Sequence, residues 1–165
     1  MKCRKNVRNL SDTEKEDYVK AVIDLKNSPS LINAAQLAGA TGRYDDYVWI
    51  HREVMGGAHT GPAFTPWHRE FLKQFEQDLQ QVSGNPNIMI PYWDWTTARA
   101  SSDPGWPFTS NFMGGLGTGP DNRVMTGRFS EASGEWRLNV ITGAGPTLPN
   151  GSPNPARDNT SYLRR

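Results

Sequence analysis

Helical periodicity in this chain of 165 residues is confined to the part before Gly84. The residues after Gly84 hold most of the 16 glycines and 12 prolines, and they contain no amphipathic helix of useful length. Glycine and proline both interrupt regular secondary structure. The length suits a single domain over residues 1–165. The sequence therefore predicts a mainly α fold, with helices in the first half and long Gly/Pro-rich loops in the second.

Three helices are expected before residue 55. Ser11 and Glu14 have the spacing of a capping box, which predicts a helix over residues 12–26. A short helix is predicted over residues 30–37, and a further one over residues 43–54. The stripe on the core-facing side of the second of these helices consists of Tyr44, Tyr47, Val48, His51 and Met55.

The strongest helical pattern begins at Thr65 and Pro66 and continues to about residue 82. Thr65 is the expected N-cap, and a proline suits the first turn because its missing N–H would have no partner there. One side of this helix is apolar and should face the core: His68, Phe71, Leu72, Phe75, Leu79 and Val82.

All three histidines of the chain fall between residues 51 and 68. His51 lies on the inward stripe of the predicted helix over residues 43–54, His59 in a glycine-rich loop, and His68 near the start of the strongest helix. Side chains placed in this way can converge on one point, as metal binding requires. Imidazole suits both copper and zinc, so the spacing leaves a copper site and a zinc hydrolase site open.

Composition excludes several other functions. The formal net charge is +1, and acidic and basic residues are mixed, which disfavours nucleic acid or an anionic membrane as a partner. No apolar run is long enough to span a membrane, and the charged N-terminus lacks a secretory signal, so we expect a cytoplasmic protein unless an unseen route exports it. Cys3 is the only cysteine, which rules out an intrachain disulfide.

The segments around the histidines resemble the tyrosinase family of type-3 copper proteins. The resemblance rests on HTGPAFTPWHREFL over residues 59–72 and PYWDW over residues 91–95. RKNV over residues 4–7 and FMGGLG over residues 112–117 are similar to bacterial tyrosinases, so the resemblance covers most of residues 4–140.

This resemblance implies a fold and a chemistry. The family holds two copper ions, each bound by three histidines from one helix pair of a four-helix bundle, and His51, His59 and His68 match the ligands of its first copper site. Tyrosinases use O2 to hydroxylate monophenols and to oxidise o-diphenols to quinones, whereas catechol oxidases perform only the second step. The resemblance thus implies a copper oxidoreductase acting on a phenolic substrate, with a non-catalytic, hemocyanin-like O2-binding module as the alternative and a mononuclear zinc hydrolase as a remote one.

The chain departs from the family pattern after His68, because it contains no further histidine. It resembles half of the tyrosinase-type bundle, apparently truncated before the second copper site, with a linker-like segment from about residue 143 to 165. We therefore expect one copper ion per chain where a complete site has two. The chain is then a truncated gene product, a processed chain, or one subunit whose partner, a second chain or a further copy in a homo-oligomer, supplies the other site. The isolated chain should have little or no phenol oxidase activity.

The sequence identifies no catalytic residue beyond the metal ligands. Phe64 and Trp67 are expected either to wall the site or to pack as ordinary core residues. Arg69 and Asp94 are predicted to pair, in a buried brace or at the surface. Glu70 and Glu76 are interpreted as solvated helix charges.

Overall fold

The computed structural model describes residues 3–32, 42–119 and 122–136. Its α-helices are α1 (Asp12–Asn27), α2 (Arg43–Glu53), α3 (Met55–Ala58) and α4 (Phe64–Ser83). Short 3-10 turns cover Val7–Asn9, Gly61–Ala63 and Glu131–Ser133, and a small antiparallel hairpin joins β1 (Gly117–Thr118) to β2 (Arg123–Val124). The mainly α fold with long loops is confirmed.

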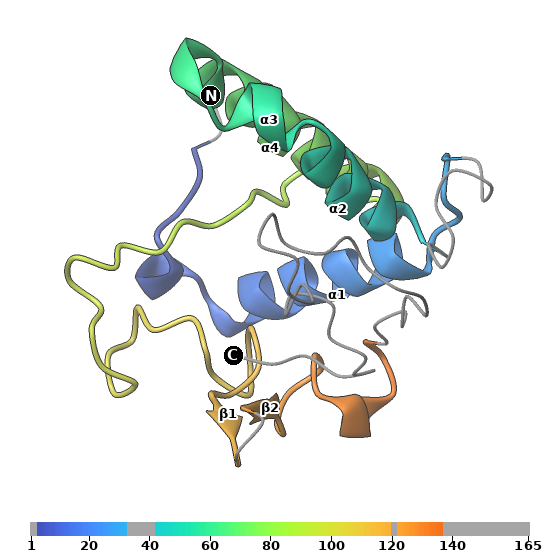
Figure 1. Ribbon diagram of the computed structural model, residues 1–165. Helices are drawn as coiled ribbons and strands as arrows, with labels where there is room; N and C mark the ends of the chain where they lie inside the picture. The colour runs from blue at the N-terminus through green and yellow to red at the C-terminus, as the bar shows by residue number, and fades with distance from the viewer. Residues whose placement is uncertain (1–2, 33–41, 120–121, 137–165) are drawn as a thin grey trace.

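Helices α2, α3 and α4 lie along one another, and α1 crosses below them and contacts both α2 and α4 (Figure 1). The capping box of α1 is formed as predicted. The Ser11 hydroxyl accepts from the Glu14 backbone N–H at 3.2 Å, and the Glu14 carboxylate accepts from the Ser11 N–H at 2.9 Å. These bonds satisfy N–H groups that the first helical turn leaves free.

Helix α4 begins two residues earlier than predicted, and the prediction of Thr65 as its N-cap is wrong. The 3-10 turn Gly61–Ala63 runs directly into the helix, so Ala63 occupies the N-cap position and Thr65 lies inside the first turn. The helix ends at Gly84, whose φ of 66° is readily adopted by glycine.

The helix over residues 43–54 is confirmed as α2 to within one residue. The helix predicted over residues 30–37 falls mainly on residues 33–41, which lie outside the described residues.

The core forms around α1, and aromatic residues from the loop-rich second half complete it. Phe112 packs on Tyr18 of α1 with ring centroids 6.0 Å apart. Trp136 packs edge-on against Tyr44 of α2 at 4.9 Å and against Phe129 at 5.1 Å. The loops of the second half are therefore anchored on the helices by large apolar side chains, each of which contributes strongly when buried.

The brace between α4 and the PYWDW segment differs from the predicted one. Arg69 and Asp94 form no pair with each other in the described part of the chain, and Asp94 instead accepts from the Thr96 N–H at 3.1 Å. Glu76, interpreted above as a solvated charge, accepts from the Ile90 N–H at 2.8 Å and from Arg4 Nε at 3.0 Å. Its side chain is only 12% exposed, because the N-terminal segment and residue 90 both pack over it.

Replacing Glu76 by alanine should lower the free energy of unfolding by about 1–3 kcal/mol, because a half-buried N–H and a guanidinium lose their acceptor. Urea denaturation measures this change. Glu70 on the same helix is exposed, as predicted, and among the described residues it bonds only to Lys73 and Gln74. Glu70→Ala is therefore the matched control, and equal effects of the two substitutions would contradict the assigned brace.

None of the helices in the described residues is long and apolar enough to cross a membrane.

Candidate metal centre

Each histidine is supplied by a different helix or helix end. His51 lies in the last turn of α2, His59 follows α3 as its C-cap, and His68 lies in α4, four residues after its first residue. The glycine-rich stretch between His51 and His68 folds as α3 and a 3-10 turn, where the sequence predicts a loop. This compact connection turns the chain back, so α2 and α4 present their histidines to the same point.

The three imidazoles converge through one nitrogen each. His59 Nε2 lies 3.1 Å from His51 Nε2 and 3.2 Å from His68 Nε2. The ligand atoms of the three residues all lie within 4.8 Å of one another. A metal bound at about 2.0–2.1 Å, with bond angles between about 90° and 110°, spaces its ligand nitrogens about 2.8–3.4 Å apart. The two short separations therefore match the spacing expected of nitrogens that share a metal ion.

Hydrogen bonding and burial favour the form of imidazole that binds metals. His68 Nδ1 lies 2.7 Å from the Phe64 carbonyl oxygen, which can only accept, so Nδ1 carries a proton, and in the neutral imidazole the lone pair is then on Nε2. Partial burial lowers the pKa of His51, and the neighbouring His59 and His68 lower it further. A lowered pKa favours neutral imidazole, the protonation state of a metal ligand.

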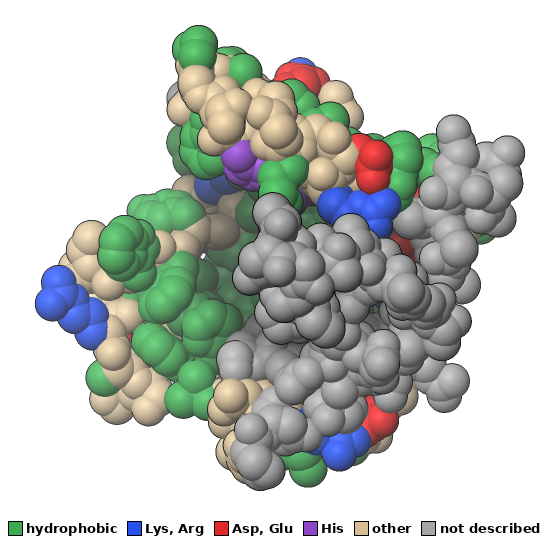
Figure 2. Space-filling model, in the orientation of Figure 1, with side chains coloured by type: hydrophobic (Ala, Val, Ile, Leu, Met, Phe, Trp, Pro, Cys, Tyr) green, Lys and Arg blue, Asp and Glu red, His purple; other side chains and the backbone are tan. Residues whose placement is uncertain are grey.

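Aromatic rings surround the three histidines. Phe64 lies 4.3 Å from His68 and 5.9 Å from His59 between ring centroids, and Trp67 lies 4.8 Å from His68 and 6.0 Å from His51. Both residues therefore wall the cluster. Phe71 joins them, since it stacks on Trp67 at 4.8 Å and lies 5.7 Å from His51. Figure 2 shows histidine at the molecular surface, directly beside hydrophobic side chains of the helix pair.

A polar network one turn before His51 joins α2 to α4. The Tyr47 hydroxyl donates to Asp78 Oδ2 at 2.6 Å, and Arg43 Nε donates to the same oxygen at 2.8 Å. Arg43 also donates to the fully buried Asp46 at 3.0 Å. Sequence reasoning placed Tyr47 only on an apolar stripe and missed its bond to Asp78, which depends on the packing of the two helices. This network fixes the relative position of the helices that carry His51 and His68.

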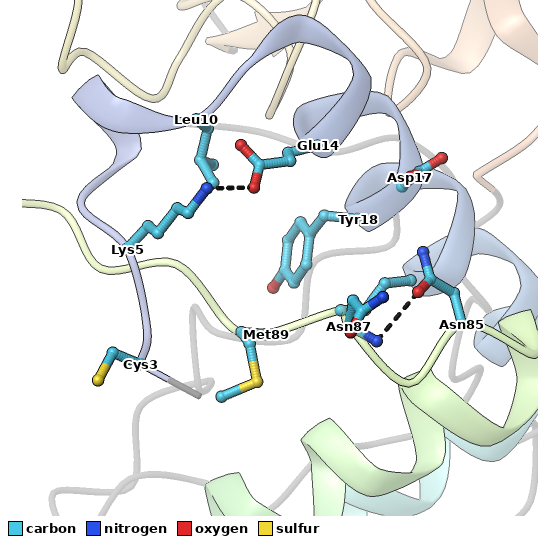
Figure 3. A pocket seen from close by; sticks show the side chains of 10 residues that line it. Cys3, Lys5, Leu10, Glu14, Asp17, Tyr18, Asn85, Asn87 and Met89 are labelled. Carbon is cyan, nitrogen blue, oxygen red and sulfur yellow. Dashed lines mark hydrogen bonds and ion pairs between the residues drawn. The ribbon is translucent and has the colours of Figure 1, made fainter. Parts of the chain in front are cut away.

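A separate cavity of about 400 Å³ lies between the N-terminal segment, α1 and residues 85–89. Tyr18 projects into it from α1, toward the segment that carries Met89 (Figure 3). Burial raises the pKa of Tyr18 above its ordinary value, so the phenol stays protonated. The three histidines do not line this cavity, which is therefore distinct from the metal centre.

A family model described as the common central domain of tyrosinase matches residues 41–165, the greater part of the chain and the part that holds the histidine cluster. The chain belongs to the tyrosinase family. Its mainly α fold is that of a tyrosinase domain, and the three converging histidines agree with the family's use of copper.

Individual relatives agree with this assignment. Grixazone synthase from Streptomyces griseus is 36% identical over 98% of this tyrosinase-family chain and 51% of its own length. A tyrosinase from Streptomyces glaucescens is 36% identical over 85% of the chain and 48% of its own length.

Among solved structures, a polyphenol oxidase mutant from Thermothelomyces thermophila superposes with a TM-score of 0.75 at 26% identity, over 99% of this chain and 47% of that one. The chain thus spans about half the length of the relatives it matches.

Proposed function

We propose that the chain binds one copper ion through His51, His59 and His68 and forms the first copper site of an oxidoreductase that oxidises phenols with O2. The observation that carries the proposal is the convergence of the three Nε2 atoms, with neighbouring separations of 3.1 and 3.2 Å. The names of the relatives point to the substrate class, because they are tyrosinases, a grixazone synthase and a polyphenol oxidase.

Family membership favours copper over the zinc hydrolase alternative. Three imidazoles by themselves suit either metal, and aromatic rings line the cluster. A zinc hydrolase also needs a group to move protons. The carboxylate of Glu70, close in sequence to His68, is instead bonded to Lys73 and Gln74 at an exposed position.

The side chains around the site have separate tasks in this proposal. The Phe64 carbonyl holds the proton of His68 on Nδ1, which keeps the lone pair of Nε2 directed at the cluster. Phe64 and Trp67 offer flat apolar surfaces on which a phenol ring can stack, and they exclude water from one side of the site. Copper, when bound, supplies the redox chemistry by which O2 oxidises the phenol.

The proposal includes a second copper site from outside the 165 residues, because three histidines bind one ion and the family chemistry uses two. Histidines of another polypeptide segment then face the cluster formed by His51, His59 and His68. The phenol, O2 and this second segment are the partners that the proposal requires.

Copper titration of the purified chain tests this function. We expect about one copper ion bound per chain, little or no bound zinc after purification, and little or no oxidation of catechol or tyrosine by the monomer. Isothermal titration calorimetry and elemental analysis measure the stoichiometry, and quinone absorbance measures the activity. Stoichiometric zinc without copper would favour the hydrolase, and robust phenol oxidation by the monomer would contradict the half-site.

A further inference from the structure

Aromatic rings in direct contact lead from the metal centre to a buried tyrosine. Trp67 lies 4.8 Å from His68 between ring centroids, and it stacks on Phe71 at 4.8 Å. Phe71 packs edge-on against Tyr47 of α2 at 5.4 Å. The helices that carry these rings, α2 and α4, lie along one another (Figure 1). The histidine cluster and Tyr47 are therefore joined by two intervening rings, without a gap between them.

The rings of this path differ in how readily they lose an electron. Indole and phenol rings are more electron-rich than the benzene ring of phenylalanine, so Trp67 and Tyr47 are the members that can be oxidised by one electron. Phe71 fills the space between them, and electron transfer is faster through packed atoms than across a void. Tyr47 is only 5% exposed, which shields a radical on its ring from other molecules.

The hydroxyl of Tyr47 has a base beside it. A phenol that loses an electron becomes a strong acid, so its oxidation is favourable only where a base takes up the proton. The Tyr47 hydroxyl donates to Asp78 Oδ2 at 2.6 Å, the length of a hydrogen bond to an ionised carboxylate. Burial raises the pKa of Tyr47, and the bond to Asp78 raises it further, so the proton is present before oxidation. The hydroxyls of Tyr18 and Tyr44 have no such partner within the part of the chain that the structure describes.

The charges around Asp78 couple the proton to the electron. Arg43 bonds to Asp78 at 2.8 Å and to the buried Asp46 at 3.0 Å, so one cation faces two carboxylates and one net negative charge remains. If the electron leaves Tyr47 and the proton moves to Asp78, the cluster becomes neutral, and buried net charge is costly. Arg43 Cζ also lies 5.0 Å from the centroid of the Tyr47 ring, so it would repel a positive charge on that ring. The neutral radical is therefore the favoured product.

We infer that Tyr47 is a redox-active tyrosine, which donates one electron through Phe71 and Trp67 toward the metal centre and its proton to Asp78. The phenol O–H bond breaks, an O–H bond forms at Asp78 Oδ2, and a one-electron oxidant formed from peroxide at the metal centre is reduced by one electron. A diphenol in solution later returns an electron, and Asp78 returns the proton.

This inference rests on the proposed function for the source of the oxidant, whereas the pair formed by Tyr47 and Asp78 needs no metal. An oxidant that forms when no phenol is bound attacks the side chains nearest to it, which are the metal ligands His51, His59 and His68. An electron from Tyr47 removes that oxidant first. The path therefore protects the ligands from oxidation.

Flash photolysis of the metal-free chain tests the redox-active pair. Ruthenium tris(bipyridine), with a cobalt(III) ammine as electron acceptor, supplies a one-electron oxidant, and EPR after rapid freezing records tyrosyl radicals. Radicals of exposed tyrosines such as Tyr92, which is 52% exposed, decay quickly by coupling between molecules, whereas the buried Tyr47 cannot couple in this way. We expect a long-lived neutral tyrosyl radical that is lost in Tyr47→Phe and reduced in Asp78→Asn, since an amide does not retain the proton.

Tyr18→Phe is the matched control, because Tyr18 is a partly buried tyrosine of α1 whose hydroxyl bonds to no carboxylate among the described residues. It should leave the long-lived radical unchanged, and circular dichroism shows that each variant is folded. A long-lived radical that survives in Tyr47→Phe, or that Tyr18→Phe removes equally, overturns the assignment to Tyr47. A full radical yield in Asp78→Asn overturns Asp78 as the proton acceptor.

Peroxide treatment of the copper-loaded chain tests the path to the metal centre, with mass spectrometry measuring oxidation of the three histidines. We expect Tyr47→Phe to raise this oxidation severalfold and Tyr18→Phe to leave it unchanged. Equal histidine oxidation in the parent chain and in Tyr47→Phe overturns the protective path. A parent chain that binds no copper overturns the proposed function instead, and the photolysis of the metal-free chain still decides whether Tyr47 is redox-active.

Discussion

Replacing His59 by alanine should weaken copper binding by at least about a hundredfold. Changing only the hydrogen-bond partner of a metal ligand already weakens metal binding by about 10- to 100-fold, and removing the ligand itself should weaken it more. His59 is the central member of the cluster, since its Nε2 is within 3.2 Å of the other two. Competition with a chromophoric copper chelator measures the affinity.

The same substitution should change the free energy of unfolding of the metal-free chain by less than about 1 kcal/mol. His59 Nδ1 is buried without a hydrogen-bond partner among the described residues, so the imidazole gives the fold little polar stabilisation. Thr60→Ala is the control, because Thr60 is exposed and its one hydrogen bond within the described part of the chain goes to the Gly56 carbonyl at 2.7 Å. Unchanged copper affinity in His59→Ala would refute the assignment of His59 as a ligand.

Replacing Asp46 by alanine should destabilise the fold by about 2–4 kcal/mol, a large share of the stability of a domain this size. Asp46 is fully buried, and its carboxylate accepts from the Leu31 N–H at 2.8 Å, from the Ser30 hydroxyl and from Arg43 at 3.0 Å. Asp46→Ala removes the acceptor of all three donors. Arg43 keeps one bond, to Asp78, and the Leu31 N–H loses the acceptor that it has in the parent chain. Urea denaturation of the metal-free chain measures the loss.

Asp12→Ala provides the comparison, because that side chain is 89% exposed and its nearest cation lies 3.9 Å away. Its free energy of unfolding should stay within experimental error of the parent chain. Because the Asp46 network also positions α2, copper affinity should fall in Asp46→Ala and not in Asp12→Ala. A destabilised variant with full copper affinity would show that this network holds the fold without positioning His51.

Local sequence signals predicted the elements that depend on neighbouring residues. The capping box of α1 needs only Ser11 and Glu14, three residues apart, and the structure forms both of its bonds. The apolar rows of α2 and α4 contain His51 and His68 as predicted, but part of each row does not face the core: Leu72 is 38% exposed, Val48 57% and Met55 53%. Amphipathic spacing shows which residues share a side of a helix and not what covers that side. Helix starts were less certain, since the 3-10 turn before Phe64 displaced the expected cap at Thr65.

Contacts between distant segments were not accessible from the same patterns. Glu76 reads as an exposed charge on α4 until Arg4 and residue 90 fold over it. Tyr47 reads as an apolar-stripe residue until α4 places Asp78 beside its hydroxyl. The extent of the domain and the linker-like segment over residues 143–165 remain predictions, because these residues lie outside the described part of the chain.

The sequence by itself determined which side chains can bind a metal, that the scaffold is mainly α, and which family the chain resembles. The count of three histidines and their places in the predicted elements follow from residue type and helical period, which are local properties. Only the tertiary structure decided that the three Nε2 atoms meet, that Phe64 orients His68, and that the metal centre lies in an exposed apolar face. These depend on how α2, α3 and α4 pack, and packing is set by contacts between residues far apart in the chain.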